Sequence, residues 1–339
     1  MDFLLDTSHT DLAAAVSAIA DRAGGIAVAR AWADGDHDPA LDVYRQLAET
    51  GITGLLIDEA YGGSGAGAVE MVVAVEVLGR VCLPGPVAET FAVVPAALDA
   101  VAARNAAACD RADLLAGRPA TCAAKPSQPR AADLGIAHGY VIADDALFQA
   151  SADGPALATV DPTRTVTAVD CAARIAALGP VAHDGAAAAF GNLGALATAA
   201  QSLGLAAAML AIAADYAKAR HQFGRAIGSF QAVKHHLADV AIAVEMARPL
   251  IHGAAVGMDG GAPGTADVTC DVSAAKVAAS DAADLAARRA LQVLGAIGYT
   301  AEHDLSLHLT KARALRGAWG PPAWHRARIA ERLRGGRPR

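Results

Sequence analysis

The sequence has few aromatic residues and no overall excess of positive charge, and each shortage argues against a class of protein. Phe, Trp and Tyr make up 4% of the 339 residues, whereas apolar residues make up 54%, much of it alanine. Alanine is the best helix former, so the composition predicts helices packed closely through small side chains. The net charge of −7 argues against a nucleic-acid partner, which would require a basic surface.

Positive charge gathers at the carboxyl end alone. Residues 305–339 contain nine Lys or Arg and one acidic residue, Glu331. Charge runs of this kind are usually solvated. Residues 326–339 could contact the phosphates of a ligand, another chain or only solvent, and of these we therefore expect solvent.

Cysteine is also scarce, and no two cysteines form a CxxC pair. The five cysteines are Cys82, Cys109, Cys122, Cys171 and Cys270. This spacing indicates neither a disulfide framework nor a zinc site, so we expect reduced thiols and no bound metal. With no secretory signal at the amino terminus, the sequence predicts a cytoplasmic protein.

One long stretch lacks charge altogether. Residues 195–214 contain no Asp, Glu, Lys or Arg over a length that could span a bilayer. Alanine is only weakly apolar, however, and Thr198, Gln201 and Ser202 interrupt the run. Because helices that are apolar on all sides are commonly buried in a protein, we expect a central bundle helix and no membrane span.

The pattern of apolar residues, glycine and proline divides the chain into three parts. Residues 1–118 have mostly helical periodicity, interrupted by a glycine-rich turn at 54–67. Residues 119–190 contain short runs of Val, Ile, Thr and Ala that indicate strands, after a Pro- and Gly-rich segment at 117–135 that is typical of a linker. Residues 191–339 are helical again, in long segments at roughly 192–220, 229–257, 265–295 and 303–318. The predicted fold is mainly α: a helical N-terminal domain, a small middle β domain and a C-terminal four-helix bundle.

Residues 220–231 read RHQFGRAIGSFQ and lie between two of the helical segments. Gly224 and Gly228 let the chain turn sharply, and the fork of Arg220 matches phosphate oxygens. The segment could therefore hold a diphosphate. Alternatively, it is a plain corner in which Arg220 caps the end of a helix, and the segment taken alone favours the corner.

Two further segments favour the diphosphate site over the plain corner. ALQVLGAIGYTAEHDL follows at 290–305, and GITGLLIDEAYGGSG stands at 51–65. In this order and setting the three segments resemble the acyl-CoA dehydrogenase family. Within it, the sequence resembles the non-catalytic subunit of the actinobacterial heterotetrameric (α2β2) enzymes that act on steroid side chains. The resemblance covers nearly the whole chain, and it is strong in the C-terminal half and poor in the middle.

The resemblance implies a chain that helps to bind FAD at its nucleotide end, usually across a subunit interface. It therefore also implies an oligomer. The matching residues are Arg220, Gln222 and Phe223 near the pyrophosphate, Phe230 and Gln231 at the adenosine end, and Gln292, Gly295 and Ala296 in the glycine-rich turn that holds the ADP portion.

The base of the family's reaction is missing. That reaction removes a proton next to the thioester while a hydride passes to the flavin, and a glutamate accepts the proton. The two positions at which family members carry this glutamate correspond to Gly194 and Trp319. No Asp or Glu occurs in residues 185–214 or 305–330, so a shifted alignment does not supply one. We expect no catalytic residue in this chain.

Other titratable side chains are weaker candidates for the base. For Glu245 and Glu302 an exposed or capping role is favoured over catalysis. His303, His308 and His325 could titrate near neutral pH, but a lone histidine on such a helix is more often structural.

Three hypotheses remain open. Residues 122–135, CAAKPSQPRAADLG, lack the flavin-ring motif of the family, which favours a partner subunit. A catalytic sister subunit would then supply the glutamate, the flavin-ring pocket and most of the acyl-CoA site. One alternative is a self-sufficient homo-oligomeric flavoenzyme with a different base or reaction, and another is a flavin-free structural or binding homologue.

Overall fold

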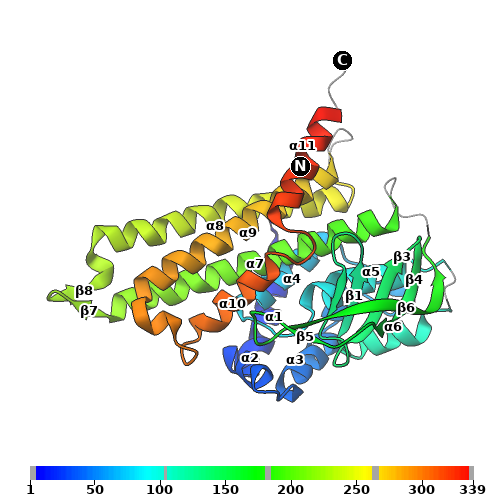
Figure 1. The fold of residues 1–339 in the computed structure, drawn as a ribbon, viewed down its shortest axis with the longest axis horizontal. Coiled ribbons are helices and arrows are strands. Elements are labelled where there is room, and N and C mark those ends of the chain that lie inside the picture. The colour runs from blue at the N-terminus through cyan, green and yellow to red at the C-terminus, as the bar shows by residue number, and fades with distance from the viewer. Residues whose placement is uncertain (1–4, 103–104, 180–184, 262–266, 336–339) are drawn as a thin grey trace.

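The computed structural model describes residues 5–102, 105–179, 185–261 and 267–335. Helices come first, a small sheet follows, and long helices complete the chain (Figure 1). This order confirms the predicted fold class. One continuous cluster of buried apolar side chains runs through all three parts.

The N-terminal part consists of short helices. The segment 10–32, which has helical periodicity throughout, is divided at Gly24 and Gly25, whose φ angles are 103° and 58°. The elements are α1 (Thr7–Arg22), α2 (Ile26–Ala33), α3 (Asp38–Glu49), the 3-10 turns η1 (Ile52–Gly54) and η2 (Glu59–Tyr61), α4 (Ala68–Arg80), the π-helical turn η3 (Glu89–Val93), α5 (Val94–Asp99) and α6 (Ala108–Leu115).

The sheet has six strands in the order β1-β3-β4-β6-β2, with β5 paired to β6. Its strands are β1 (Ala120–Ala124), β2 (Arg130–Ala132), β3 (His138–Ala143), β4 (Ala146–Ala152), β5 (Leu157–Ala158) and β6 (Thr165–Ala177). The linker expected at 117–135 is wrong, because β1 and β2 lie in this segment and every residue of β1 is buried. Pro126 and Pro129 lie in the turn between β1 and β2, and Pro119 directly precedes β1, so these prolines do not mark a connection between domains.

The C-terminal part is a bundle of long helices joined by tight turns. Its elements are α7 (Ala186–Ala219), β7 (His221–Gln222), β8 (Arg225–Ala226), η4 (Ile227–Ser229), α8 (Gln231–Met258), α9 (Val268–Leu294), η5 (Gly295–Tyr299), α10 (Leu305–Leu315) and α11 (Pro322–Gly335). The predicted boundary at 118/119 falls between α6 and β1, whereas the boundary at 190/191 falls inside α7.

Helix α11 was not predicted, because its sequence is basic and has little apolar periodicity. Part of its charge is paired: Arg326 forms a salt bridge with Asp281, and the Nε atom of Arg332 lies 3.8 Å from Asp267. The expectation of a purely solvated charge run is therefore only partly right.

Helix α7 lies at the centre of the bundle and packs against α4, α8 and α9. Two glycines allow α4 and α7 to cross in close contact, since a Cβ atom on Gly204 would lie 2.0 Å from the carbonyl oxygen of Glu76. A Cβ atom on Gly79 would likewise lie 2.2 Å from the carbonyl oxygen of Gln201. By length and composition α7 and α8 could each cross a membrane, but 78% of the apolar stretch of α7 is buried inside the protein. Helix α7 is thus a central bundle helix, as its sequence predicts.

Candidate functional site

The RHQFGRAIGSFQ segment forms a short hairpin at one end of the bundle (Figure 1). In this hairpin Gln222 pairs with Arg225 across the turn. The turn residues Phe223 and Gly224 have φ angles of 53° and 78°, as in two-residue hairpin turns that need positive φ at both central positions. The Phe223 side chain is 91% exposed, so the turn presents an aromatic ring to solvent.

A small aromatic cluster surrounds this tip. The guanidinium carbon of Arg225 lies 4.1 Å from the centre of the Phe230 ring. The rings of Phe223 and Phe230 meet edge to face, with their centres 6.1 Å apart. Arg225 was missed by the sequence reasoning, although its place between Phe223 and Phe230 in the motif was a signal that could have found it.

The polar residues predicted to contact the nucleotide are exposed. Arg220 ends α7, and its backbone N–H donates to the carbonyl oxygen of Tyr216 at 2.9 Å. Within the described part of the chain, no ion pair or hydrogen bond engages its guanidinium. The same holds, over these residues, for the side-chain amides of Gln222, Gln231 and Gln292.

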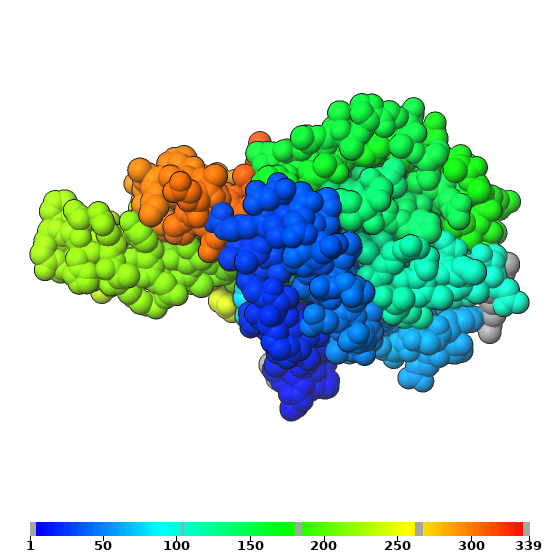
Figure 2. All heavy atoms as spheres, turned by 90° about the horizontal axis from the view of Figure 1, so that it is seen from below, coloured from blue at the N-terminus to red at the C-terminus, as the bar shows by residue number. Residues whose placement is uncertain are grey.

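The second motif lies at the same end of the molecule. Figures 1 and 2 both show the turn at η5, drawn in orange, beside the yellow-green hairpin and the start of α8. Gln292, Gly295 and Ala296 are all exposed. Gly295 has a φ angle of 65°, which favours glycine, and no atom lies within 4 Å of where its Cβ would be. All eight predicted nucleotide-contacting residues thus lie at one end of the bundle.

The two positions predicted for the base lie against each other, far along the bundle from that end. The Trp319 side chain is fully buried. A Cβ atom on Gly194 would lie 2.2 Å from Cδ2 of the indole. The ring therefore fills the space that a side chain at position 194 would need.

Polar groups from three parts of the chain hold Trp319 in place. Its indole N–H donates to Oε1 of Glu89 at 3.0 Å, and its backbone N–H donates to Oε1 of Gln128 at 3.1 Å. Its carbonyl oxygen lies 3.0 Å from Nε2 of His325. Burial lowers the pKa of His325 to about 4, so this ring is neutral and serves as a hydrogen-bonding support.

Glu89 is a buried carboxylate that the sequence reasoning missed. It belongs to the π-helical turn η3 and is 1% exposed. Its Oε1 atom lies 3.9 Å from the guanidinium of Arg164, and its Oε2 atom has no hydrogen-bond partner among the described residues. Because the indole covers it, this carboxylate is not open to a substrate.

The remaining titratable candidates show no catalytic arrangement. The side chain of Glu245 is 71% exposed and lies 3.8 Å from Arg248, and Glu302 is exposed. His303 accepts the backbone N–H of Leu305 at 3.1 Å. His308 is buried between two backbone carbonyls, and burial lowers its pKa.

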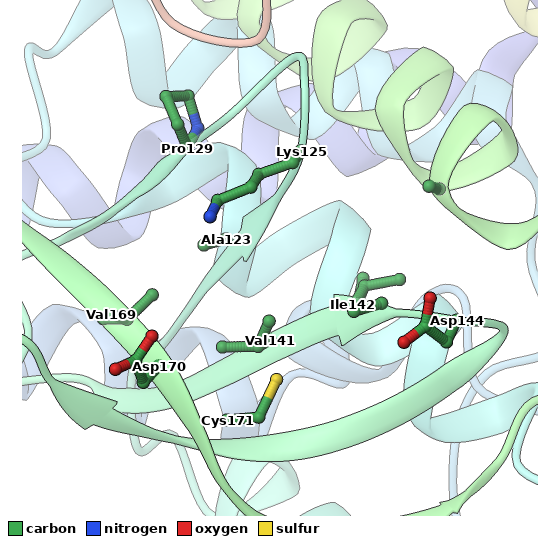
Figure 3. Close-up of a pocket in the computed structure, with 11 residues that line it drawn as sticks. Ala123, Lys125, Pro129, Val141, Ile142, Asp144, Val169, Asp170 and Cys171 are labelled. Carbon is green, nitrogen blue, oxygen red and sulfur yellow. The ribbon is translucent and has the colours of Figure 1, made fainter.

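A cavity of about 340 Å³ lies on the sheet, next to the start of α7 (Figure 3). Lys125, Asp144, Asp170 and Cys171 line it together with small apolar side chains. None of the predicted site residues takes part. Within residues 5–102, 105–179, 185–261 and 267–335, no group of three His, Cys, Asp or Glu side chains could hold a metal ion.

Comparison with known proteins decides the family. The family model "Acyl-CoA dehydrogenase, N-terminal domain" matches residues 6–102, and "Acyl-CoA dehydrogenase, C-terminal domain" matches residues 184–334. Acyl-CoA dehydrogenase IpdE2 of Mycobacterium tuberculosis is 32% identical over 319 residues, which cover 87% of each chain. The chain belongs to the acyl-CoA dehydrogenase family.

Solved structures of acyl-CoA dehydrogenases share the fold. The steroid ACAD Tcur3481-Tcur3483 (a variant) aligns with a TM-score of 0.82 and 24% identity, over 97% of this chain and 98% of that chain. The ChsE4-ChsE5 complex of Mycobacterium tuberculosis aligns with a TM-score of 0.77 and 24% identity, over the full length of both chains.

Acyl-CoA dehydrogenases are oxidoreductases acting on CH–CH bonds, and their cofactor is FAD, which PigA, a solved structure with the same fold, also binds. The exposed end of the bundle fits the nucleotide half of this cofactor. Arg220 offers an unpaired planar fork for phosphate oxygens, the glutamines offer free amides, and Phe223 offers an uncovered ring. The centre of the bundle does not offer a similar fit for a reacting acyl group, because the buried Trp319 indole, at one of the two predicted base positions, packs against Gly194 at the other.

Proposed function

We propose that this chain is the non-catalytic subunit of a flavin-dependent acyl-CoA dehydrogenase that introduces a double bond next to an acyl-CoA thioester. One observation carries the proposal. The unpaired nucleotide-contacting residues are kept at the surface, while the two base positions are a glycine and a buried tryptophan in contact. Such a chain can assist a flavin, but among its described residues no group is placed to accept the proton of the substrate.

The proposed roles of this chain and of its sister subunit follow from the positions of the residues. Arg220 and Gln222 would grip the pyrophosphate, Phe230 and Gln231 the adenosine, and Gln292 with the turn at Gly295 the ADP portion. FAD held there would supply the hydride acceptor of the reaction. The glutamate, the flavin-ring pocket and most of the acyl-CoA site would come from a catalytic sister subunit.

The proposed assembly is an α2β2 heterotetramer. The names of two similar structures support a partner subunit, since one is a complex of ChsE4 with ChsE5 and the other combines Tcur3481 with Tcur3483. The latter is named a steroid ACAD, so we extend the proposal to a steroid-derived, polycyclic acyl-CoA as the substrate class. Free thiols at all five cysteines support a cytoplasmic location.

Co-expression tests the proposal. The full-length chain is purified alone and together with a candidate catalytic acyl-CoA dehydrogenase subunit, and flavin absorbance is read in the gel-filtration peak. We expect the pair to be yellow and to oxidise acyl-CoA, and the chain alone to be colourless. A yellow chain alone would favour the self-sufficient flavoenzyme, and a complex without flavin would favour the structural homologue.

A further inference from the structure

We infer that Trp319 is a built-in ligand: its indole fills the space between the two positions that the resemblance assigns to the base, so that a side chain at Gly194 has no room, and it joins the three parts of the fold around it. The inference goes beyond the proposed function and does not depend on a sister subunit. It rests on the contacts that surround one buried side chain.

The backbone around Trp319 is shaped to turn the ring inward. Trp319 lies between α10 and α11 and has a φ angle of 54°, and Gly320 follows with a φ angle of 95°. Positive φ is uncommon for a bulky residue and must be compensated by its surroundings. A Cβ atom on Gly320 would lie 2.7 Å from the Trp324 ring and 2.9 Å from Nε2 of His325, so the loop is closely packed behind the indole.

The surroundings of the ring have the features of a ligand pocket. Gly194 leaves room for a flat ring by having no side chain. Glu89 places a carboxylate oxygen 3.0 Å from the indole nitrogen, and it is itself 1% exposed. The pocket therefore matches a planar aromatic group with one N–H donor at its edge, the chemical class to which indole belongs.

The three parts of the chain meet at this ring. Glu89 comes from the N-terminal helices, Gln128 from the strand region, and Gly194 and His325 from the bundle. Removing the indole would leave Glu89 without the hydrogen bond at its Oε1 atom and would open a cavity at the junction. Trp319 consequently acts as a clamp at the junction of the three parts, at a position that the resemblance assigns to the base.

Indole rescue of Trp319→Gly tests this inference on the full-length chain. We expect the variant to keep its helical circular dichroism and to melt on the order of 10 °C below the unmodified protein. Added indole should bind it and recover part of this loss. Indene, which has the same shape without the N–H, should bind about tenfold more weakly, because it cannot donate to Glu89.

The matched control is Trp324→Gly, since Trp324 lies in the same region but is only partly buried and stacks with Arg328. Indole should not raise the melting temperature of this control or of the unmodified protein. A folded Trp319→Gly variant that binds no indole, or that melts like Trp324→Gly, would overturn the inference.

A second variant covers the case in which Trp319→Gly does not fold. Trp319→Phe keeps a ring but loses the donor to Glu89, so we expect it to fold and to melt several degrees below the unmodified protein. An unchanged melting temperature would overturn the inference that Trp319 acts as a clamp. Neither measurement needs flavin or a sister subunit, so failure here is distinguishable from failure of the proposed function.

Discussion

Arg220 shows most clearly, at the scale of one residue, what the chain can offer a cofactor. Its guanidinium is exposed at the end of α7, and the described residues provide it with no carboxylate. An arginine fork gives two parallel hydrogen bonds to a phosphate, which a lysine cannot reproduce. Substitution of Arg220 is therefore a specific test of the nucleotide-binding role.

We predict that Arg220→Ala weakens FAD binding by the proposed complex about 10- to 100-fold, since a hydrogen bond to a charged group contributes roughly 1.5–3 kcal/mol. Arg220→Lys should bind FAD more weakly than the unmodified complex but more tightly than Arg220→Ala. The control is Lys218→Ala, because Lys218 is exposed near the end of the same helix and pairs with Asp215 at 2.9 Å. Flavin retained after gel filtration measures the effect, and an equal loss in Lys218→Ala would contradict a specific role for the fork.

Lys276 is a residue whose charge the fold accommodates poorly. It is fully buried on α9, and its Nζ atom donates to the carbonyl oxygen of Leu315 at 2.9 Å. Burial lowers the pKa of Lys276 from 10.5 to about 7, and the charges of Arg316 and Arg164 act in the same direction. Between these two pKa values the unfolded chain holds a proton that the folded chain has released, so this residue makes stability rise with pH in that window.

Lys276→Met should therefore stabilise the protein most at low pH. Below pH about 7 the variant avoids the full cost of a buried charge, and we expect a gain of about 2–4 kcal/mol after the lost hydrogen bond is counted. The gain should shrink as the pH rises toward about 10. Urea unfolding of both proteins across this range measures it, and a difference that does not change with pH would show that the charge of Lys276 is not responsible.

At the scale of elements, α8 has an outer face that the chain itself leaves uncovered. Ile242, Met246 and Leu250 follow at intervals of four along this helix and are 63%, 67% and 44% exposed. Residues at this spacing lie on one side of a helix, and exposed apolar rows commonly mark a contact with another protein. In the proposed heterotetramer this face of α8 would contact another subunit.

We predict that Met246→Glu reduces the mass of the assembly, because a charge cannot be buried in such a contact without a partner. Glu245→Gln is the control, since Glu245 directly precedes Met246 and is exposed, and its replacement alters the charge without adding any to the apolar row. Light scattering after gel filtration gives the mass of each. If Met246→Glu leaves the mass unchanged, this face of α8 is not part of the interface.

At the scale of the whole molecule, local patterns in the sequence predict the order of the parts but not the contacts among them. Alanine-rich periodicity predicts α7 and α9, and the spacing of glycines locates the tight turns. The contact between Glu89 and Trp319 joins residues 230 positions apart, and no local pattern signals such a pair. Strand β1 was missed for a related reason: small residues beside prolines resemble a linker until the sheet that buries them is known.

A buried ion pair also ties the strand region to the bundle. Nζ of Lys311 lies 3.0 Å from Oδ2 of Asp161 and 2.7 Å from Oγ1 of Thr163, and all three side chains are buried. Burial raises the pKa of Asp161, but Lys311 and the hydrogen bonds from Thr163 outweigh this and leave it below its ordinary value. The pair therefore stabilises the protein near neutral pH, and this contribution is lost as the pH falls through the pKa of Asp161.

Lys311→Met should destabilise the protein by about 3–5 kcal/mol, because it leaves the Asp161 carboxylate buried without a counter-charge. Asp161→Asn combined with Lys311→Met removes both charges, and we expect the double variant to recover most of the loss. Urea unfolding at neutral pH compares the three proteins. Additive losses in the double variant would mean that the two charges do not stabilise each other, and that the strand region is held to the bundle mainly by the continuous apolar core.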